Sequence, residues 1–261
     1  MSKLSPAIVA CAGALLASAG HAEPAVIGLA RAYLGPDTAL DGIASIHLVG
    51  NLERVDPDHA DKGPIRGTID LIFVKPLRQR QVVRMPEATE TTVLDGYDAW
   101  DILQDNAEPA KHVLTWLGAD DIRAIRASTW ENLYFYRVRK GEVVVEDKGL
   151  VTTEGVACER VDFIHGPGIV YERCFDRDTG RLVSTSRGLE TIRESGEIRA
   201  DGVRFPKTIV SVRKTASGKD LVSTVIFDTV TLNEPVEPGV FSIPSLLPSK
   251  AVKAAAGPQV K

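Results

Sequence analysis

The chain has 261 residues, of which 44% are hydrophobic and 25% are charged, and its formal net charge is −4. These proportions are those of an ordinary globular protein and exclude collagen-like, coiled-coil and disordered chains. The slight acidic excess argues against a nucleic-acid-binding surface, which normally carries net positive charge, and one long apolar run is too few for a multi-span membrane protein.

The apolar run is at the N-terminus and has the pattern of a secretory signal peptide. A short basic start precedes apolar and small residues, and Gly20 and Ala22 put small side chains at the −3 and −1 positions of a cleavage before Glu23. Residues 1–22 are therefore predicted to be a cleaved signal peptide, and the mature protein is predicted to reach the periplasm. The alternative is lipidation at Cys11, which follows an apolar and small sequence.

The mature chain keeps two cysteines, Cys158 and Cys174. An even pair in an oxidising compartment favours a disulfide. Strand-like runs at 156–163 and 169–175 flank a Gly-Pro turn, and a hairpin between them places the cysteines opposite each other. Two apolar and two opposite-charge pairs agree with this register: Phe163 with Ile169, Val161 with Tyr171, Arg160 with Glu172, and Glu159 with Arg173. A disulfide is predicted, with two buried free thiols as the alternative.

The first elements of the mature chain are predicted to be helical. Residues 23–44 carry apolar side chains at helical spacing, with a break at Gly35-Pro36 and a second short helix that Asp37 can cap. Strand-like alternation follows, with a polar loop at 56–64 after the first strand. The predicted strands of this half cover residues 46–52, 68–73, 80–85, 91–94 and 99–103.

The strand pattern is interrupted at residues 107–133, where two helices are predicted. The first starts at Pro109 and ends at Gly118, and acidic residues at Asp120-Asp121 open the second. The apolar residues of these helices are Val113, Leu114, Trp116 and Leu117 in the first, and Ile122, Ile125 and Trp130 in the second.

Strand patterns then continue to the end of the domain. They cover residues 142–149, 155–163, 169–175, 181–187, 189–199, 203–213 and 220–231. Short strands at this spacing favour a sandwich or barrel over βαβ units. The expected fold class is mainly β with a few helices (α+β), with about eleven strands. One domain is expected over residues 23–247, followed by a disordered basic tail over 248–261.

Catalytic and metal-binding motifs are absent from the sequence. It has no nucleophile elbow, Walker loop, dinucleotide-binding glycine pattern or His-Glu-x-x-His. The acidic loop around His59 fails the calcium template, because Ala60 and Gly67 stand at two ligand positions. The protein is therefore not expected to be an enzyme or to bind a metal. The alternative is a hydrolase with a carboxylate site. Its carboxylates would be Asp98, Asp101 and Asp105.

A curved antiparallel sheet has a concave face that must be filled. Three consecutive strands present apolar residues on one face, and we expect these to line a cavity for an apolar ligand: Ile46, Leu48, Ile69, Leu71, Phe73, Val83 and Met85. The segment 107–133 is the predicted lid, and its contacts to the cavity would come from Trp116, Leu117, Ile122 and Ile125. Ordinary core packing of these side chains is the alternative.

Five segments in their order and spacing resemble the LolA/LolB-like outer-membrane lipoprotein-sorting proteins. They begin with Ala-Arg-Ala-Tyr-Leu-Gly at 30–35 and include the Asp-x-x-Thr-Gly turn and the Asp-Gly-Val-Arg-Phe-Pro sequence. Their ranges are 30–35, 39–50, 175–183, 200–206 and 230–244, which together span most of the mature chain.

This resemblance implies an unclosed β-barrel with helices over its concave side. It implies a periplasmic, non-catalytic and monomeric carrier of lipid or lipoprotein acyl chains, with no cofactor and with a membrane protein as a further partner. The alternative within the same fold is a sensor or scaffold that binds a protein through the open edge of the sheet.

Overall fold

The structure is a computed structural model that describes residues 23–139, 141, 143–153 and 155–243. The predicted signal peptide at 1–22 and the predicted tail at 248–261 lie outside these residues. Within the described part of the chain, no helix combines the length and the hydropathy that crossing a membrane requires.

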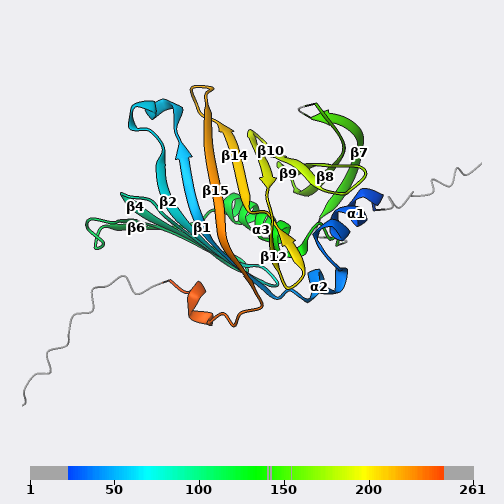
Figure 1. The fold of residues 1–261 in the computed structure, drawn as a ribbon. Helices are drawn as coiled ribbons and strands as arrows, with labels where there is room; N and C mark the ends of the chain where they lie inside the picture. Colours follow the sequence, from blue (N-terminus) through cyan, green and yellow to red (C-terminus); the bar gives the residue numbers. More distant parts are fainter. Residues whose placement is uncertain (1–22, 140, 142, 154, 244–261) are drawn as a thin grey trace, which may run out of the picture.

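One large, curved antiparallel sheet of 13 strands forms most of the molecule, in the order β6-β5-β4-β3-β2-β1-β15-β14-β11-β10-β9-β8-β7. Strands β6 and β7 are its two edges, so the sheet does not close into a barrel (Figure 1). The strands of the N-terminal half are β1 (Ser45–Val55), β2 (Ile65–Val74), β3 (Arg78–Arg84), β4 (Ala88–Asp95), β5 (Asp98–Asp105) and β6 (His112–Trp116). The expected mainly β fold with an unclosed, curved sheet is confirmed.

The second half adds β7 (Val144–Thr153), β8 (Val156–Gly166), β9 (Ile169–Phe175), β10 (Leu182–Arg187), β11 (Glu190–Ser195), β14 (Thr208–Lys214) and β15 (Asp220–Leu232). A separate two-stranded sheet consists of β12 (Ile198–Ala200) and β13 (Val203–Phe205). The predicted runs 189–199 and 203–213 are thus two strands each, because turns divide them where the chain leaves the large sheet.

Three α-helices lie beside the sheet: α1 (Ala25–Leu34), α2 (Asp37–Gly42) and α3 (Ala119–Tyr134). Two short 3₁₀ helices, η1 (Pro57–Lys62) and η2 (Pro238–Phe241), complete the elements. The break at Gly35-Pro36 is where it was predicted, but Asp37 does not cap α2. Its carboxylate instead accepts a hydrogen bond from Arg31 Nε at 2.8 Å, because the side chain of Arg31 in α1 reaches across the break.

The helix predicted to start at Pro109 is wrong. Residues His112–Trp116 form the edge strand β6, which pairs with β5 so that Val113 lies opposite Leu103 and Trp116 opposite Trp100. A short apolar run is compatible with either periodicity, and here the exposed edge of β5 decides it by supplying backbone hydrogen bonds. The second predicted helix is confirmed as α3.

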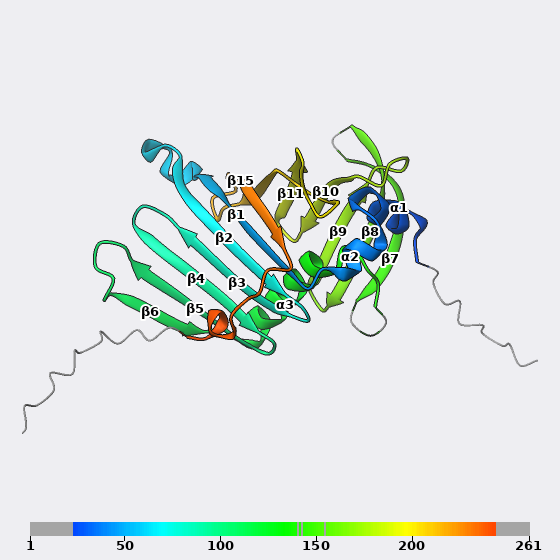
Figure 2. The same ribbon diagram turned by 60° about the horizontal axis from the view of Figure 1, so that its bottom comes forward.

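Helix α3 lies within the curve of the sheet (Figures 1 and 2). Its buried Leu133 and the following Phe135 pack into a hydrophobic cluster with side chains of β1, β2, β3 and β15. All seven residues predicted to share the concave face belong to this cluster or pack against it. These seven residues therefore lie in one hydrophobic cluster, and their role in lining a ligand cavity stays a prediction.

Two other clusters fill the remaining surfaces. Helix α1 packs through Ile27 and Ala30 against β8, β9 and β10, where Phe163 and Phe175 are fully buried. On the opposite, convex face of the sheet, Phe241 of η2 packs with Trp100 and other side chains of β4 and β5. The C-terminal segment therefore covers the side of the sheet that α3 leaves open (Figure 2).

Arg31 joins the three helices. Its buried guanidinium donates hydrogen bonds to the carbonyl oxygens of Phe135 at 2.8 Å and Tyr134 at 3.2 Å, and it pairs with Asp37 and Asp41. A cation at the last carbonyls of a helix is favourable, because those carbonyls have no partner within the helix. These contacts fix the C-terminal end of α3 to α1 and α2.

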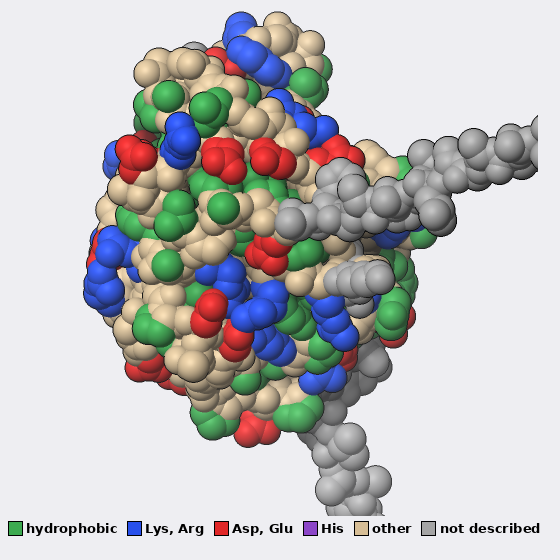
Figure 3. Space-filling model, turned by 90° about the vertical axis from the view of Figure 1, so that its right-hand side faces the viewer, with side chains coloured by type: hydrophobic (Ala, Val, Ile, Leu, Met, Phe, Trp, Pro, Cys, Tyr) green, Lys and Arg blue, Asp and Glu red, His purple; other side chains and the backbone are tan. Residues whose placement is uncertain are grey.

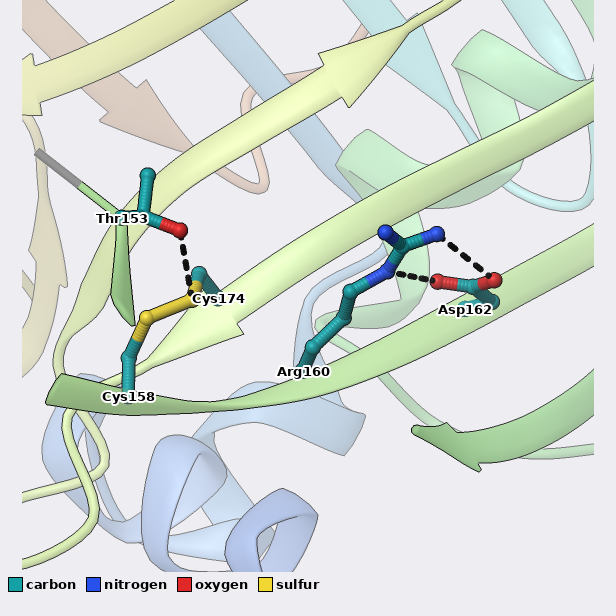
Figure 4. Close-up of a disulfide and its surroundings, with 5 residues drawn as sticks. All are labelled: Thr153, Cys158, Arg160, Asp162 and Cys174. Carbon is teal, nitrogen blue, oxygen red and sulfur yellow. Dashed lines mark hydrogen bonds and ion pairs between the residues drawn. A yellow bond between two sulfur atoms is a disulfide. The ribbon is translucent and has the colours of Figure 1, made fainter. Parts of the chain in front are cut away.

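The predicted disulfide between Cys158 and Cys174 is present, with their Cα atoms 5.5 Å apart (Figure 4). The predicted register of the hairpin is wrong by two residues, since Phe163 faces Tyr171 and Arg160 faces Cys174. Strand β8 continues to Gly166 and leaves a tighter turn than expected. A register shift of two residues keeps every side chain on the same face of the sheet. The two cysteines therefore still lie close enough to bond, although they are diagonal neighbours and not directly opposite.

The charged pairs of this hairpin change accordingly. Asp162 faces Glu172 across the strands, and Arg160 binds both, with Nε 2.9 Å from Asp162 (Figure 4) and Nη2 3.0 Å from Glu172. One guanidinium thus neutralises two carboxylates that would otherwise repel each other.

Candidate functional site

A cavity of about 360 Å³ lies between the concave face of the sheet and α3. Its walls come from β1, β2 and β3, from the C-terminal half of α3, and from β9, β10, β11, β14 and β15. Strands from both halves of the chain therefore contribute to one internal space.

One wall is apolar. It consists of Ile46 and Leu48 of β1, Leu71 and Phe73 of β2, and Phe227 of β15. Four of the seven residues predicted to line an apolar cavity are thus in this wall. The other three, Ile69, Val83 and Met85, belong to the same hydrophobic cluster farther from the cavity.

The lid side of the cavity is formed by residues that the sequence analysis missed. Ser128, Glu131, Asn132 and Phe135 line it, at the i, i+3, i+4 and i+7 spacing of one helix face. Three of the four are polar, so a search for apolar periodicity passes over them. The only available signal was their spacing, which places Ser128, Glu131 and Asn132 on neighbouring positions of α3 with Phe135 directly after its end.

The four residues predicted as lid contacts are not among those that line the cavity. Trp116 ends edge strand β6, where 61% of its surface is exposed, and Leu117 follows it. Ile122 and Ile125 are half-buried in the first half of α3, whereas the cavity faces the second half. Whether they ever contact a ligand stays a prediction.

Between the helix side of the cavity and strands β8 and β9 lies a buried group of polar side chains centred on Glu131 of α3. The guanidinium of Arg173 in β9 binds one oxygen of Glu131, and Nε2 of His165 in β8 lies 2.5 Å from the other. Burial alone would raise the pKa of Glu131, but the charge of Arg173 and the hydrogen bond with His165 outweigh it and lower that pKa. Glu131 is therefore ionised and ties α3 to the sheet.

Aromatic rings hold Arg173 in place. Its guanidinium carbon lies 4.7 Å from the ring centre of Tyr136, 4.9 Å from that of Phe163 and 5.6 Å from that of Tyr171, within the range of cation–π attraction. Next to it, Arg187 of β10 pairs with Glu190 at 2.8 Å. This wall is thus rigid, polar and largely paired.

A second cavity of about 230 Å³ adjoins the first. The two share six lining residues: Leu34, Tyr136, Glu194, Arg204, Phe205 and Pro206. At this junction, burial raises the pKa of Glu194, with Arg173 acting in the opposite sense, and burial likewise raises the pKa of Tyr136. The junction therefore favours the neutral forms of both groups.

Neither a family model nor a curated protein matches the sequence. Solved structures do match. A LolA superfamily protein from Nitrosomonas europaea is 13% identical, with a TM-score of 0.54 over 82% of this chain and 97% of that one. A domain from Vibrio parahaemolyticus assigned to the outer membrane lipoprotein-sorting proteins is 9% identical, with a TM-score of 0.53 over 83% of this chain and 95% of that one.

A DUF1329 family protein from Desulfovibrio piger is 9% identical, with a TM-score of 0.54 over 83% of this chain and 95% of that one. The fold is that of the LolA superfamily. The resemblance stated from the sequence is thus confirmed for the fold.

Within the LolA-like sheet, the carboxylates of the hydrolase alternative do not converge. Asp98 points to the opposite face of β5 from Asp101 and Asp105, because side chains alternate along a strand. Asp101 and Asp105 are four residues apart on one strand, which is about 13 Å at ~3.3 Å per residue. Asp101 accepts a hydrogen bond from Thr92 at 2.8 Å, and Asp105 caps the following turn.

The acidic loop of the LolA-like fold at η1 is occupied by protein contacts. Asp58 accepts hydrogen bonds from Ser217 and pairs with Lys219 in the turn between β14 and β15, and Asp56 contacts His59 at 3.0 Å. Among the described residues there is no group of three or more His, Cys, Asp or Glu side chains placed to hold a metal ion.

The outer surface at the β7 and α1 end of the LolA-like fold mixes both signs of charge. Acidic and basic side chains are interspersed with hydrophobic ones there (Figure 3). The arrangement is that of an ordinary solvated surface, so the internal cavity remains the more specific feature of the molecule.

Proposed function

We propose that the protein is an exported, periplasmic carrier or binding protein for an acyl lipid or a similar apolar ligand, and that it has no catalytic role. The cavity between the concave face of the sheet and α3 carries this proposal, because it joins an apolar wall to a helix that covers it. The fold it shares with lipoprotein-sorting proteins agrees with this function.

The energetics of such binding are favourable. Each methylene group moved from water into an apolar site contributes about 0.8 kcal/mol, so half of a typical acyl chain provides enough free energy for tight binding. Release requires that α3 move, and its contacts through Arg31 and Glu131 define what must break. The helix is therefore the lid in this proposal, with its second half over the ligand.

A second candidate function is protein binding at the free edge of the sheet. Edge strand β6 exposes 62% of Val113 and 61% of Trp116. Unpaired edge strands with exposed apolar side chains are places where another chain can add a strand. This candidate predicts a protein partner and no extractable lipid.

The test is mass spectrometry of lipid released by denaturation from protein purified from the periplasm without detergent. We expect one acyl lipid per protein molecule. If no lipid is released and none binds when lipid or lipopeptide is added, the carrier function is wrong and the edge-binding candidate takes its place.

A matched pair of variants locates the ligand. Leu71 lines the cavity, so Leu71→Arg should abolish lipid binding while the protein is still secreted. Leu189→Arg places the same charge in a turn where 77% of the leucine surface is exposed, and it should bind lipid as the wild type does. Unchanged binding by a folded Leu71→Arg variant would place the ligand elsewhere.

A further inference from the structure

The cavity contains a hydrogen-bond donor that lacks an acceptor. The side chain of Arg173 is only 8% exposed, and while Nη1 binds Glu131, its Nε finds no hydrogen-bond partner among the described residues. Leaving a buried donor unpaired costs about 1–3 kcal/mol, and such a group calls for an explanation. The surrounding rings prevent Arg173 from turning toward water.

A second donor of the same kind lies at the junction of the two cavities. Arg204 pairs with Glu197 and stacks on Tyr33, with its guanidinium carbon 4.4 Å from the ring centre. Its Nε is also buried without a hydrogen-bond partner in the described part of the chain. Arg173 and Arg204 line the same cavity, and the Nε–H group of each thus has no acceptor in the described part of the chain.

Glu194 faces the same space from β11. Unlike Glu131 and Glu190, it has no ion pair or hydrogen bond within the described ranges, although the charge of Arg173 acts on it. Removal from water favours its protonated form, in which the carboxyl group can donate a hydrogen bond. Three side chains that line the cavity beside the apolar wall, Arg173, Arg204 and Glu194, thus have hydrogen-bonding groups that no described residue satisfies.

We propose that the natural ligand is a single-chain amphiphile with a carboxylate head group. The head group lies inside the cavity at Arg173 and Glu194, and the chain lies along the apolar wall. This inference rests on the proposed function and names the ligand class for that site. A carboxylate accepts several hydrogen bonds, and bonds between ionised groups are roughly twice as strong as neutral ones.

The binding step moves one proton. At a pH at which part of the free protein still has Glu194 ionised, binding of the ligand carboxylate takes up a proton from solvent, because two adjacent carboxylates cannot both stay ionised. That proton lies between their oxygens, and Arg173 faces the remaining negative charge. The other titratable or charged side chains that line the two cavities are Glu131, Tyr136, Tyr171, Arg187, Glu190 and Arg204 in the first, with Tyr33 and Arg181 added by the second.

The size of the cavity favours one chain. At about 360 Å³ it is near the lower end of the ~300–1,000 Å³ of typical ligand pockets. The adjoining cavity of about 230 Å³ leads past Arg204 and gives a route by which a head group could enter.

The experiment compares head groups on one chain length. Titration calorimetry with delipidated mature protein would use dodecanoate, methyl dodecanoate, dodecyl phosphate and dodecyltrimethylammonium. We expect dodecanoate to bind at least tenfold more tightly than the methyl ester, and the cationic amphiphile to bind weakest, because Arg173 repels it. Tighter binding of dodecyl phosphate than of dodecanoate would assign the head site to a phosphate and overturn the carboxylate.

Variants connect the preference to Arg173. Glu131→Gln/Arg173→Gln removes both members of the buried pair and should reduce the preference for dodecanoate over its methyl ester from tenfold to less than threefold. Arg173→Lys keeps a positive charge beside Glu131 but lacks the Nε–H donor. If the double variant fails to fold, this variant replaces it and should likewise reduce the preference for dodecanoate over its methyl ester. Arg66→Gln, on an exposed arginine of β2, is the control and should keep the full preference.

Proton uptake tests the role of Glu194. The binding enthalpy of dodecanoate should depend on the ionisation enthalpy of the buffer at pH 7, and this dependence should vanish in Glu194→Gln while tight binding persists. If all head groups bind equally and no variant changes this, the carboxylate site is wrong and the lipid-binding function stands. If none of the amphiphiles binds, both proposals are wrong.

Discussion

The two walls of the cavity are built in different ways. The wall from β1 and β2 is a face of alternating apolar residues whose burial comes from the hydrophobic effect alone. The wall from β9, β10 and β11 is charged, and Arg173, Arg187 and Glu190 in it each form an ion pair with a side chain of another element. A substitution in the first wall should therefore reduce stability in proportion to the apolar area it removes. In the second wall, loss of one partner leaves the other charge unpaired and should reduce stability sharply.

The largest effect should come from breaking the buried pair on one side. Arg173→Ala leaves the carboxylate of Glu131 buried without its cation, so we expect a loss of about 3–5 kcal/mol in the free energy of unfolding. Glu131→Gln/Arg173→Gln removes both charges and should cost less than half of that. Urea unfolding of the three proteins measures this, and equal losses in both variants would contradict the pairing argument.

A second comparison separates a sealed core from a cavity wall. Phe163 is 1% exposed and sealed under α1, so Phe163→Ala should cost about 4 kcal/mol in the free energy of unfolding. Phe73 is 4% exposed but borders an existing cavity, so Phe73→Ala, which removes fewer packing contacts, should cost about 3 kcal/mol. The reverse order in urea unfolding would mean that the cavity is collapsed in solution.

The disulfide is the next largest contribution, and it belongs to the charged half of the sheet. Cys158 and Cys174 are separated by 16 positions in sequence, and closing such a loop stabilises the folded state by about 3 kcal/mol in the chain-entropy model. Adding reductant should lower the urea midpoint by a corresponding amount and raise the mass of the protein by two hydrogens. Identical masses with and without reductant would show that the thiols are free.

The smallest expected effect is a pH dependence at Glu194. Because its pKa is raised in the folded state, the folded protein binds more protons than the unfolded one between the two pKa values, and stability falls as pH rises through that window. Glu194→Gln removes this decline, so it should gain stability over the wild type as the pH is raised from 4 to 8. Thermal unfolding across this range measures it, and parallel curves would contradict a buried carboxyl group.

The apolar wall was predictable because each of its residues carries its own signal. Ile46 and Leu48 flank His47, and Ile69 and Leu71 flank Asp70, so the sequence alternates locally there, although Ile72 and Val74 beside Phe73 are apolar as well. The charged wall was not predictable, because nothing near Glu131 in sequence shows that it meets His165 and Arg173. Whether these three side chains are buried together is decided only by how β8, β9 and α3 assemble.

Two other errors have similar physical causes. Residues 112–116 have no strong local preference, and the free edge of β5 made them a strand. The hairpin of β8 and β9 keeps the pair of Arg160 with Glu172 in either register, and Arg160 also binds Asp162 in the observed one. Cross-strand pairing alone therefore left a shift of two residues unresolved, while the cysteines met in both.

The position of β1 beside β15 in the sheet has a consequence for how the protein folds. Strands β2 to β6 are each hydrogen-bonded to the preceding strand in the chain, and so are β8 to β11. The pairing of β1 with β15, which places Ile46 opposite Leu232, joins the two ends of the described domain. Since contacts between distant residues form slowly, two locally assembled ribbons should exist before this seam closes, and the cavity can retain a ligand only after the last long strand is in place.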